Sequence, residues 1–165
     1  MKKKSKAGIL LDLGCGGNKQ GPNWVGMDMR KLPGVDIVHD LEKFPYPLKD
    51  ESVLTCVSSH VLEHLKPWFT IPIFDEVWRI MKPEGQWAIS LPYAGSHGFW
   101  QDPTHCNGFN ETTFLYFDPE PKELGGQLNV LYHIYKPKPW KIIHSYWQAN
   151  GQMEVLLEKR REGKA

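Results

Sequence analysis

The chain has 165 residues, of which 41% are hydrophobic, and its 20 basic and 19 acidic residues give a formal net charge of +1. This length predicts one domain with its own core, and the balanced charge argues against a broad nucleic-acid or membrane surface. Three cysteines without a CxxC pair are typical of a reducing compartment, and no apolar run reaches the roughly 20 residues of a membrane span, so we expect a cytoplasmic protein that does not enter the membrane.

Residues 1–8 are rich in lysine, and we expect them to form a basic, flexible tail. The apolar run Ile9–Leu13 then meets the glycine-rich stretch Gly14–Gly17 without a spacer, which predicts a buried parallel strand ending in a tight loop. Glycines permit a sharp bend and close approach of a ligand to the backbone. Because open α/β sheets bind ligands at the carboxyl ends of their strands, this junction is the expected cofactor position.

The glycine loop differs from two well-known nucleotide motifs. A dinucleotide fingerprint would need a third glycine where Lys19 stands, and an acidic residue roughly 20 residues further on, whereas Asp28 comes too early. A G-x-x-x-x-G-K-[ST] phosphate loop is also missing. These departures argue against a nicotinamide cofactor and against a P-loop nucleotide site.

The first half of the chain alternates short apolar runs with turn signals. Gly21-Pro22 leaves room for at most one helical turn before the second strand, which ends at Asp28. The prolines within Phe44–Leu48 predict an irregular, extended segment. The strands predicted in this half are Ile9–Leu13, Trp24–Met27, Val35–Val38 and Val53–Val57.

A helix and a fifth strand follow. Pro67 suits the first turn of a helix whose apolar spacing continues through a break expected near Pro72. We expect this helix to end at Lys82–Gly85, with a basic residue and then glycine. The next strand is Trp87–Leu91, and it leads to Tyr93.

Residues 94–126 are too long and too rich in aromatic and polar groups for a simple connector. Within them Thr112–Phe117 predicts a helical turn, and the aromatic side chains either wall a substrate or fill the core, the latter being favoured. The strands predicted beyond this loop are Val130–Tyr135, Ile142–Tyr146 and Met153–Glu158.

Five segments follow one another in the order of a known family: Leu11–Gly16, Val25–Asp28, Val35–Leu41, Ser58–Leu65 and Glu76–Gly85. Together they resemble the class I S-adenosylmethionine-dependent methyltransferases, in the small branch with a short first helix. The resemblance covers residues 9–92 in the family's order. It implies an α/β fold, namely a Rossmann-like, doubly wound and mostly parallel sheet with an antiparallel terminal strand, in three αβα layers. It also implies one domain over residues 9–165, with 94–126 as an insertion on the substrate side.

The resemblance also implies which residues hold S-adenosylmethionine and its product S-adenosylhomocysteine. Asp12 and the loop would hold the methionine end, Asp28 the ribose hydroxyls, and Asp40 the adenine. The loop amides would suit the cofactor's carboxylate. The full set of expected cofactor residues is Asp12, Gly14, Cys15, Gly16, Gly17, Lys19, Asp28, Met29, Asp40, Leu41, Ser58 and Ser59.

The acceptor side has fewer signals. His60, after the fourth strand, and His105, in the long loop, are alternative general bases, since imidazole titrates near neutral pH. Asp102 could orient one of them, and Tyr93 could hydrogen-bond the substrate. The pair Glu63-His64 recurs in the family chiefly as a structural corner. Histidine spacing here matches metal motifs only loosely, so no metal is expected.

Three functions remain open on the sequence. The first is methylation of a small molecule, such as a sugar or nucleotide derivative. The second is methylation of nucleic acid, but Ser58–His60 stands where base amino-methyltransferases carry Asn/Asp-Pro-Pro-Tyr, and the charge is near neutral. The third is a non-catalytic binding or assembly module that keeps the fold. The sequence does not indicate an oligomeric state.

Overall fold

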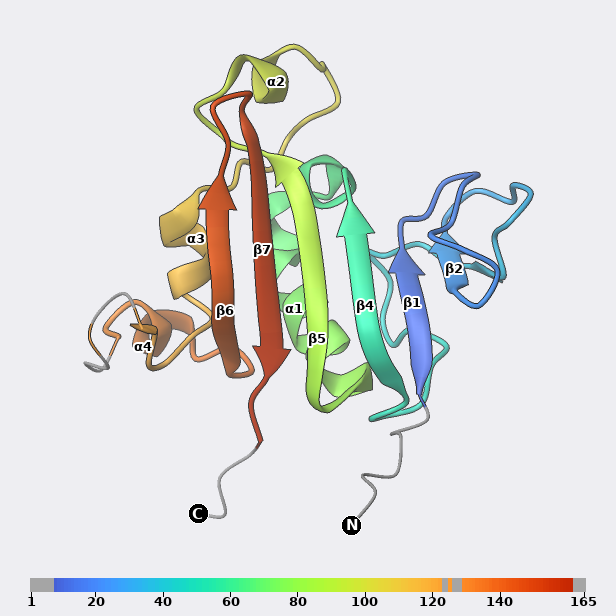
Figure 1. Cartoon of the computed structure of the whole chain (residues 1–165), viewed down its shortest axis with the longest axis horizontal. Coiled ribbons are helices and arrows are strands. Elements are labelled where there is room, and N and C mark those ends of the chain that lie inside the picture. The colour runs from blue at the N-terminus through green and yellow to red at the C-terminus, as the bar shows by residue number, and fades with distance from the viewer. Residues whose placement is uncertain (1–7, 123–124, 126–128, 162–165) are drawn as a thin grey trace.

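The computed structural model describes residues 8–122, 125 and 129–161. Its centre is one seven-stranded sheet in the order β3-β2-β1-β4-β5-β7-β6 (Figure 1). The predicted basic tail falls almost entirely on residues 1–7, which lie outside the described residues. The strands are β1 Ile9–Leu13, β2 Val25–Asp28, β3 Ile37–Val38, β4 Val53–Ser59, β5 Met81–Pro92, β6 Trp140–Trp147 and β7 Gln152–Lys159.

The direction of the strands confirms the predicted Rossmann-like sheet. β1 pairs in parallel with β2 and β4, and β3 and β5 extend this parallel part on either side. β7 runs antiparallel between β5 and β6. The strand order reverses between β1 and β4, so their carboxyl ends form the switch point at which ligands bind in open α/β sheets.

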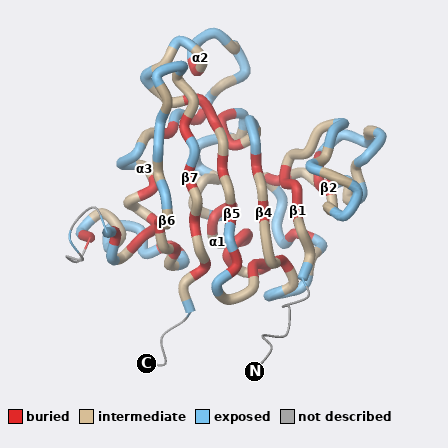
Figure 2. The backbone as a smooth tube through the Cα atoms, viewed as in Figure 1, coloured by how far each residue is buried: buried red, intermediate tan, exposed pale blue. Residues whose placement is uncertain are grey.

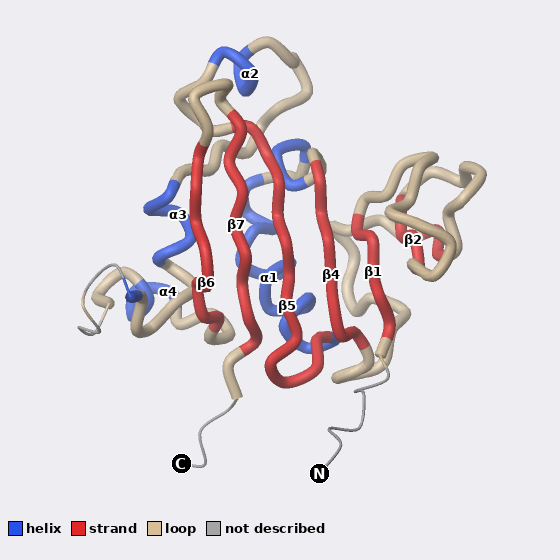
Figure 3. The backbone as a smooth tube through the Cα atoms, in the orientation of Figure 1, coloured by secondary structure: helices blue, strands red, loops and turns tan. Residues whose placement is uncertain are grey.

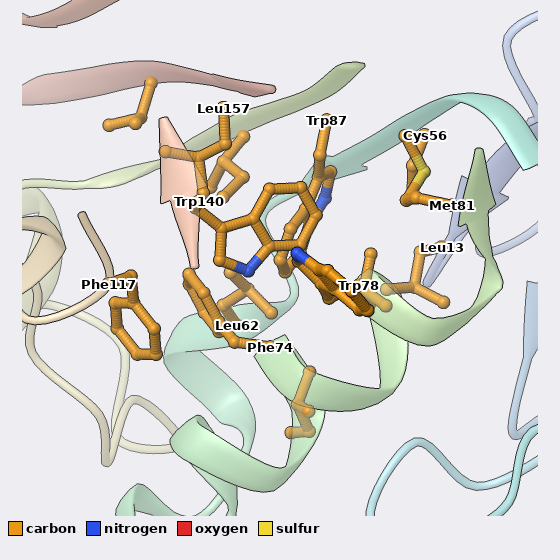
Figure 4. Packing of buried hydrophobic residues seen from close by; sticks show 14 of the residues in the cluster. Leu13, Cys56, Leu62, Phe74, Trp78, Met81, Trp87, Phe117, Trp140 and Leu157 are labelled. Atoms are coloured by element: carbon orange, nitrogen blue, oxygen red, sulfur yellow. The ribbon is translucent and has the colours of Figure 1, made fainter. Parts of the chain in front are cut away.

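Helices cover one face of the sheet. Helix α1, Thr70–Ile80, lies behind the strands in the view of Figure 3, and helix α3, Glu111–Leu115, lies beside the edge strand β6. Phe74 packs on Trp87 of β5 with 4.8 Å between ring centroids, and Trp140 of β6 lies against the same core (Figure 4). The shorter helices are η1 Leu62–His64, η2 Pro67–Phe69, α2 His97–Trp100 and α4 Tyr132–Tyr135.

The opposite face of the sheet has no helix within the described ranges. The connections from β1 to β4 contain only loops, because prolines such as Pro22, Pro45 and Pro47 interrupt them. Buried residues accordingly alternate with more exposed ones along β7 (Figure 2). The α/β fold class is therefore as predicted, with the second helical layer reduced to loops.

The boundaries of α1 correct two expectations. The helix runs through Pro72 without a break, because this proline lies in the first turn, where its missing N–H costs no intrahelical bond. The helix ends at Ile80 rather than at Lys82–Gly85. Those four residues form an irregular part of β5, where Glu84 has a φ of 63° and a β-carbon on Gly85 would lie 2.8 Å from the carbonyl oxygen of Lys82.

The later part of the chain holds one wrong strand prediction. The segment Val130–Tyr135 contains the short helix α4 instead of a strand. In the part of the chain described, it does not pair with the sheet, because the edge strand β6 pairs only with β7. Val130, Ile134 and Tyr135 are exposed, so these residues have no sheet surface on which a strand could pack. The predicted strands Ile142–Tyr146 and Met153–Glu158 are confirmed within β6 and β7, and the turn at Thr112–Phe117 is confirmed as α3.

Candidate functional site

The glycine loop is folded onto the end of β2. The amides of Gly14 and Cys15 donate to the carbonyl oxygen of Met27 at 2.8 and 3.2 Å. The amide of Gly16 donates to Oδ2 of Asp28 at 2.9 Å. These three amides therefore hold the loop in place, and their donation to the cofactor's carboxylate stays a prediction.

Asp28 is a carboxylate at the carboxyl end of β2, one strand away from the switch point. Its side chain is buried, and Oδ1 accepts from the amide and from Nε of Arg30 at 2.9 and 3.1 Å. Burial raises the pKa of Asp28, but hydrogen bonds from Arg30 and from the Gly16 amide outweigh it and hold the pKa below its ordinary value. A carboxylate offers about four lone-pair positions, so Asp28 can also accept from a ligand hydroxyl.

A pocket of about 640 Å³ lies beside Asp28. This volume is within the range of small-molecule and cofactor sites. The pocket brings together several residues predicted for the cofactor and adds others, among them Arg30, Glu42 and Lys66. The predicted residues that line it are Gly14, Asp28, Met29, Asp40, Leu41 and His60.

Gly14 shows why this loop needs glycine. It adopts a φ of 75°, in the left-handed region that residues with a β-carbon avoid. A β-carbon there would lie 2.4 Å from Cγ2 of Val61, which also lines the pocket. The loop after β1 and the segment after β4 thus pack without a gap.

Several predicted cofactor residues lie outside the lining of this pocket. Asp12 is buried and accepts from the amide of Gln20 at 2.8 Å, and burial raises the pKa of Asp12. Lys19 pairs with Asp36 at 2.7 Å. Cys15 packs toward β2, where a β-carbon on Gly26 would lie 2.7 Å from its Sγ. The contacts of Asp12, Lys19 and Cys15 therefore hold the glycine loop against the neighbouring segments.

The two serines at the end of β4 also lie outside the pocket lining. Ser58 is buried in the core, where its hydroxyl accepts from Nε1 of Trp87 at 3.0 Å. Ser59 lines a separate depression on the helix-free face of the sheet. Gly16 and Gly17 lie in the loop next to the pocket but are not among its lining residues.

A second, smaller pocket of about 220 Å³ adjoins the first. His60 and His64 line both pockets. The smaller pocket also brings together His105 and Asp102, which the sequence placed on the acceptor side. Polar groups thus converge beside the cofactor-sized pocket.

His60 is held in a strained position at the boundary of the two pockets. It has a φ of 53°, which is unusual for a residue with a side chain, and its amide donates to the carbonyl oxygen of Ser90 at 2.9 Å. Its Nδ1 lies 3.1 Å from Oε1 of Glu63, a carboxylate that is fully buried. The bond assigns the proton to Nδ1 and leaves Nε2 as the basic nitrogen.

His105 is fixed from the opposite side. Its Nδ1 donates to the carbonyl oxygen of Phe99 at 2.7 Å, and its Nε2 lies 3.9 Å from both Oε1 of Glu63 and Oδ2 of Asp102. Hydrogen bonds from Thr104 lower the pKa of Asp102. His105 thus faces the same buried carboxylate as His60.

Tyr93 does not line either pocket. Its amide donates to the carbonyl oxygen of Gly151 at 2.8 Å, and its ring stacks on Trp147 with 5.3 Å between centroids. The expected hydrogen bond from Tyr93 to a substrate has no support in this arrangement. Trp100 in the same long loop is exposed, whereas Phe99, Phe109, Phe114 and Phe117 are buried, which agrees with the favoured core interpretation.

Glu63 and His64 are functional candidates that the sequence interpretation treated as a structural corner. The structure places both in the smaller pocket, next to His60 and His105. The one available signal was the density of titratable residues in Ser58–Leu65, which holds two histidines and a glutamate. Arg30, two residues after the end of β2, is a further residue of the larger pocket that the sequence interpretation does not include.

Comparisons with known proteins bear on the fold. No protein-family model matches the chain. No curated protein matches its sequence. A SAM dependent methyltransferase from Archaeoglobus fulgidus has a similar structure, with a TM-score of 0.62 and 18% identity over 93% of this chain and 87% of that one. The chain has the class I methyltransferase fold.

Further solved structures of the methyltransferase fold agree. The 1,6-didemethyltoxoflavin-N1-methyltransferase of Burkholderia thailandensis, solved with 1,6-didemethyltoxoflavin and S-adenosylhomocysteine, matches with a TM-score of 0.63 and 11% identity over 93% of this chain and 71% of that one. An S-adenosylmethionine dependent methyltransferase from Mesorhizobium loti matches with a TM-score of 0.53 and 13% identity over 92% of each chain.

Among the described residues, every helix is too short or too polar to cross a bilayer.

Proposed function

We propose that this protein is an S-adenosylmethionine-dependent methyltransferase that acts on a small molecule, such as a sugar or nucleotide derivative, in the cytoplasm. The observation that carries the proposal is the carboxylate of Asp28 at the carboxyl end of β2, in a cofactor-sized pocket that adjoins a histidine-lined one. The methyltransferase fold supports the same conclusion.

The residues of the larger pocket fit the cofactor. Asp28 keeps acceptor positions for ribose hydroxyls, and Asp40 and Leu41 offer a polar and an apolar contact for adenine. The cofactor supplies an activated methyl group on a positively charged sulfonium. The carboxylates of Asp28 and Glu42 are paired with Arg30 and Lys66 at 3.1 and 2.6 Å, so these ion pairs fix the lining of the pocket and leave it near neutral.

On the acceptor side we assign His60 as the general base. It lines both pockets, and Glu63 orients it so that Nε2 can take a proton from an acceptor hydroxyl or amine. His105 is less suited to this role, because its Nε2 is close to two carboxylates within the protein. The volume of about 220 Å³ favours a small acceptor over a polymer held along a groove.

Calorimetric binding of S-adenosylmethionine and S-adenosylhomocysteine tests the cofactor assignment. We expect micromolar dissociation constants for both, and Asp28→Asn should weaken them about 10- to 100-fold, the value of one charge-assisted hydrogen bond. The matched control is Asp36→Asn, since Asp36 also sits beside β2 and accepts from an amide, that of Gly26 at 2.8 Å, but does not line the pocket. Failure of the folded wild-type chain to bind either compound would refute the proposal.

The assignment of the base has its own test. With an acceptor found by screening hydroxylated and amino-bearing sugars and nucleotides, His60→Gln should lower the rate of methyl transfer about 100-fold or more. Cofactor affinity should change less than about tenfold, because His60 forms only one edge of that pocket. An unchanged rate would refute the role of His60, and salt-sensitive binding of RNA or DNA in the same screen would favour the nucleic-acid alternative.

A further inference from the structure

We propose that Glu63, His64 and His105 form a binding site for one divalent first-row transition metal ion. One potential ligand atom from each residue lies within 4.8 Å of the other two. Two imidazoles and one carboxylate are a donor set that such ions prefer. Metal binding here does not depend on the proposed methyltransferase function.

The carboxylate of Glu63 is the first reason. The side chain is fully buried, and within the described residues its Oε2 has no hydrogen-bond partner. A buried carboxylate oxygen without a partner is costly and calls for a compensating group. The other oxygen, Oε1, is already used by His60 at 3.1 Å. Oε1 also faces Nε2 of His105 at 3.9 Å, and a cation bound by this carboxylate would compensate its buried charge.

The second reason is the fixed orientation of both imidazoles. Nδ1 of His105 donates to the carbonyl oxygen of Phe99 at 2.7 Å. The hydroxyl of Thr104 donates to Asp102 at 2.7 Å, so its oxygen is left to accept from Nδ1 of His64 at 2.9 Å. In both rings Nε2 therefore keeps its lone pair. Metal-binding histidines commonly show this arrangement, with the other ring N–H bound to a carbonyl or a polar oxygen.

The third reason is that the site is held together before any ion binds. His105 belongs to the loop after β5, and that loop is tied to η1 because the amides of Cys106 and Asn107 donate to the carbonyl oxygen of Glu63 at 2.9 and 3.1 Å. The rings of His64 and His105 pack edge to face, with 4.7 Å between centroids. Ligands from distant parts of the sequence are thus positioned by backbone contacts.

Three protein ligands leave coordination positions open, as in catalytic rather than structural metal sites. The site lies where the smaller pocket adjoins the cofactor-sized one. If the proposed function holds, a metal there would bind an acceptor oxygen and make its proton easier to remove by His60. This last step rests on the proposed function, whereas the metal site itself does not.

The test is metal binding to the purified chain, with any histidine tag removed and bound metal stripped by a chelator. We titrate Zn²⁺ by calorimetry and Co²⁺ by its visible absorption. We expect one ion per chain, and Glu63→Gln and His105→Ala should each weaken binding on the order of 100-fold, because even the outer partners of metal ligands are worth about 10- to 100-fold. The matched control is His97→Ala, which removes an exposed histidine from the same loop.

Thermal unfolding followed by circular dichroism separates loss of binding from loss of folding. If Glu63→Gln does not fold, His64→Gln replaces it, because the side chain of His64 is less buried than Glu63. The proposal is overturned if the folded wild-type chain binds neither ion, or if His97→Ala weakens binding as much as His105→Ala does. Binding of S-adenosylhomocysteine is measured on the same samples, so failure of the metal site and failure of the cofactor site are distinguished.

Discussion

Replacing Gly14 by alanine should destabilise the protein strongly. A side chain at its φ of 75° costs about 1–2 kcal/mol. The new β-carbon would also lie 2.4 Å from Cγ2 and 2.7 Å from Cβ of Val61, and overpacking of this kind costs about 1–3 kcal/mol. The sum, about 2–5 kcal/mol, is a large part of the roughly 5–15 kcal/mol that keeps a domain folded.

The assay is urea unfolding at equilibrium, and the control is Gly17→Ala in the same loop. A β-carbon on Gly17 meets nothing within 4 Å, so this change should shift the free energy of unfolding by less than about 1 kcal/mol. The double variant Gly14→Ala/Val61→Ala should recover part of the loss, but not all, because Cβ of Val61 remains. Equal stabilities for Gly14→Ala and Gly17→Ala would refute this reasoning.

Two further predictions concern buried polar groups. Burial raises the pKa of Glu76, but hydrogen bonds from Arg79 and from a backbone amide outweigh it and lower the pKa below 4.5. The ionised Glu76 therefore stabilises the fold fully above pH 4.5, and this stabilisation is lost as the pH falls through the lower pKa of the folded state. Glu76→Gln should reduce the loss of unfolding free energy between about pH 7 and pH 3, measured by urea unfolding. An unchanged pH dependence in the variant would contradict this. Trp87→Phe should lower the free energy of unfolding by about 1 kcal/mol more than Trp140→Phe does. The reason is that Nε1 of Trp87 donates to Ser58, whereas Nε1 of Trp140 has no hydrogen-bond partner among the described residues. Equal urea midpoints for the two variants would argue against this prediction.

Local sequence was sufficient to locate each strand of the sheet in the described residues and two residues of the cofactor-sized pocket. An apolar run that stops at glycine or aspartate marks the carboxyl end of a strand, and this placed Gly14 after β1 and Asp28 at the end of β2, where both line the cofactor-sized pocket. The alternation along β4 could also have placed Ser58, because it lies two residues after the buried Cys56 and thus on the same face. Adjacent serines that look alike in sequence face opposite sides of the sheet.

The acceptor side could not be predicted in the same way. The contact of Glu63 with His105 depends on how the loop after β5 docks on η1, which no local pattern encodes. Val130–Tyr135 was misassigned for a related reason, because a strand needs a free neighbour and the sheet offers none to this segment. Tertiary contacts decided both cases.

The position of β7 has a consequence for folding. Within the described residues β6 joins the sheet only through β7, although it precedes β7 in the chain. β7 in turn must reach β5 across the segment between Pro92 and Gln152, a long closure that slows folding. β6 can therefore join the sheet only once β7 is in place, whereas all described lining residues of the cofactor-sized pocket except Cys106 belong to the five parallel strands and the segments up to α1.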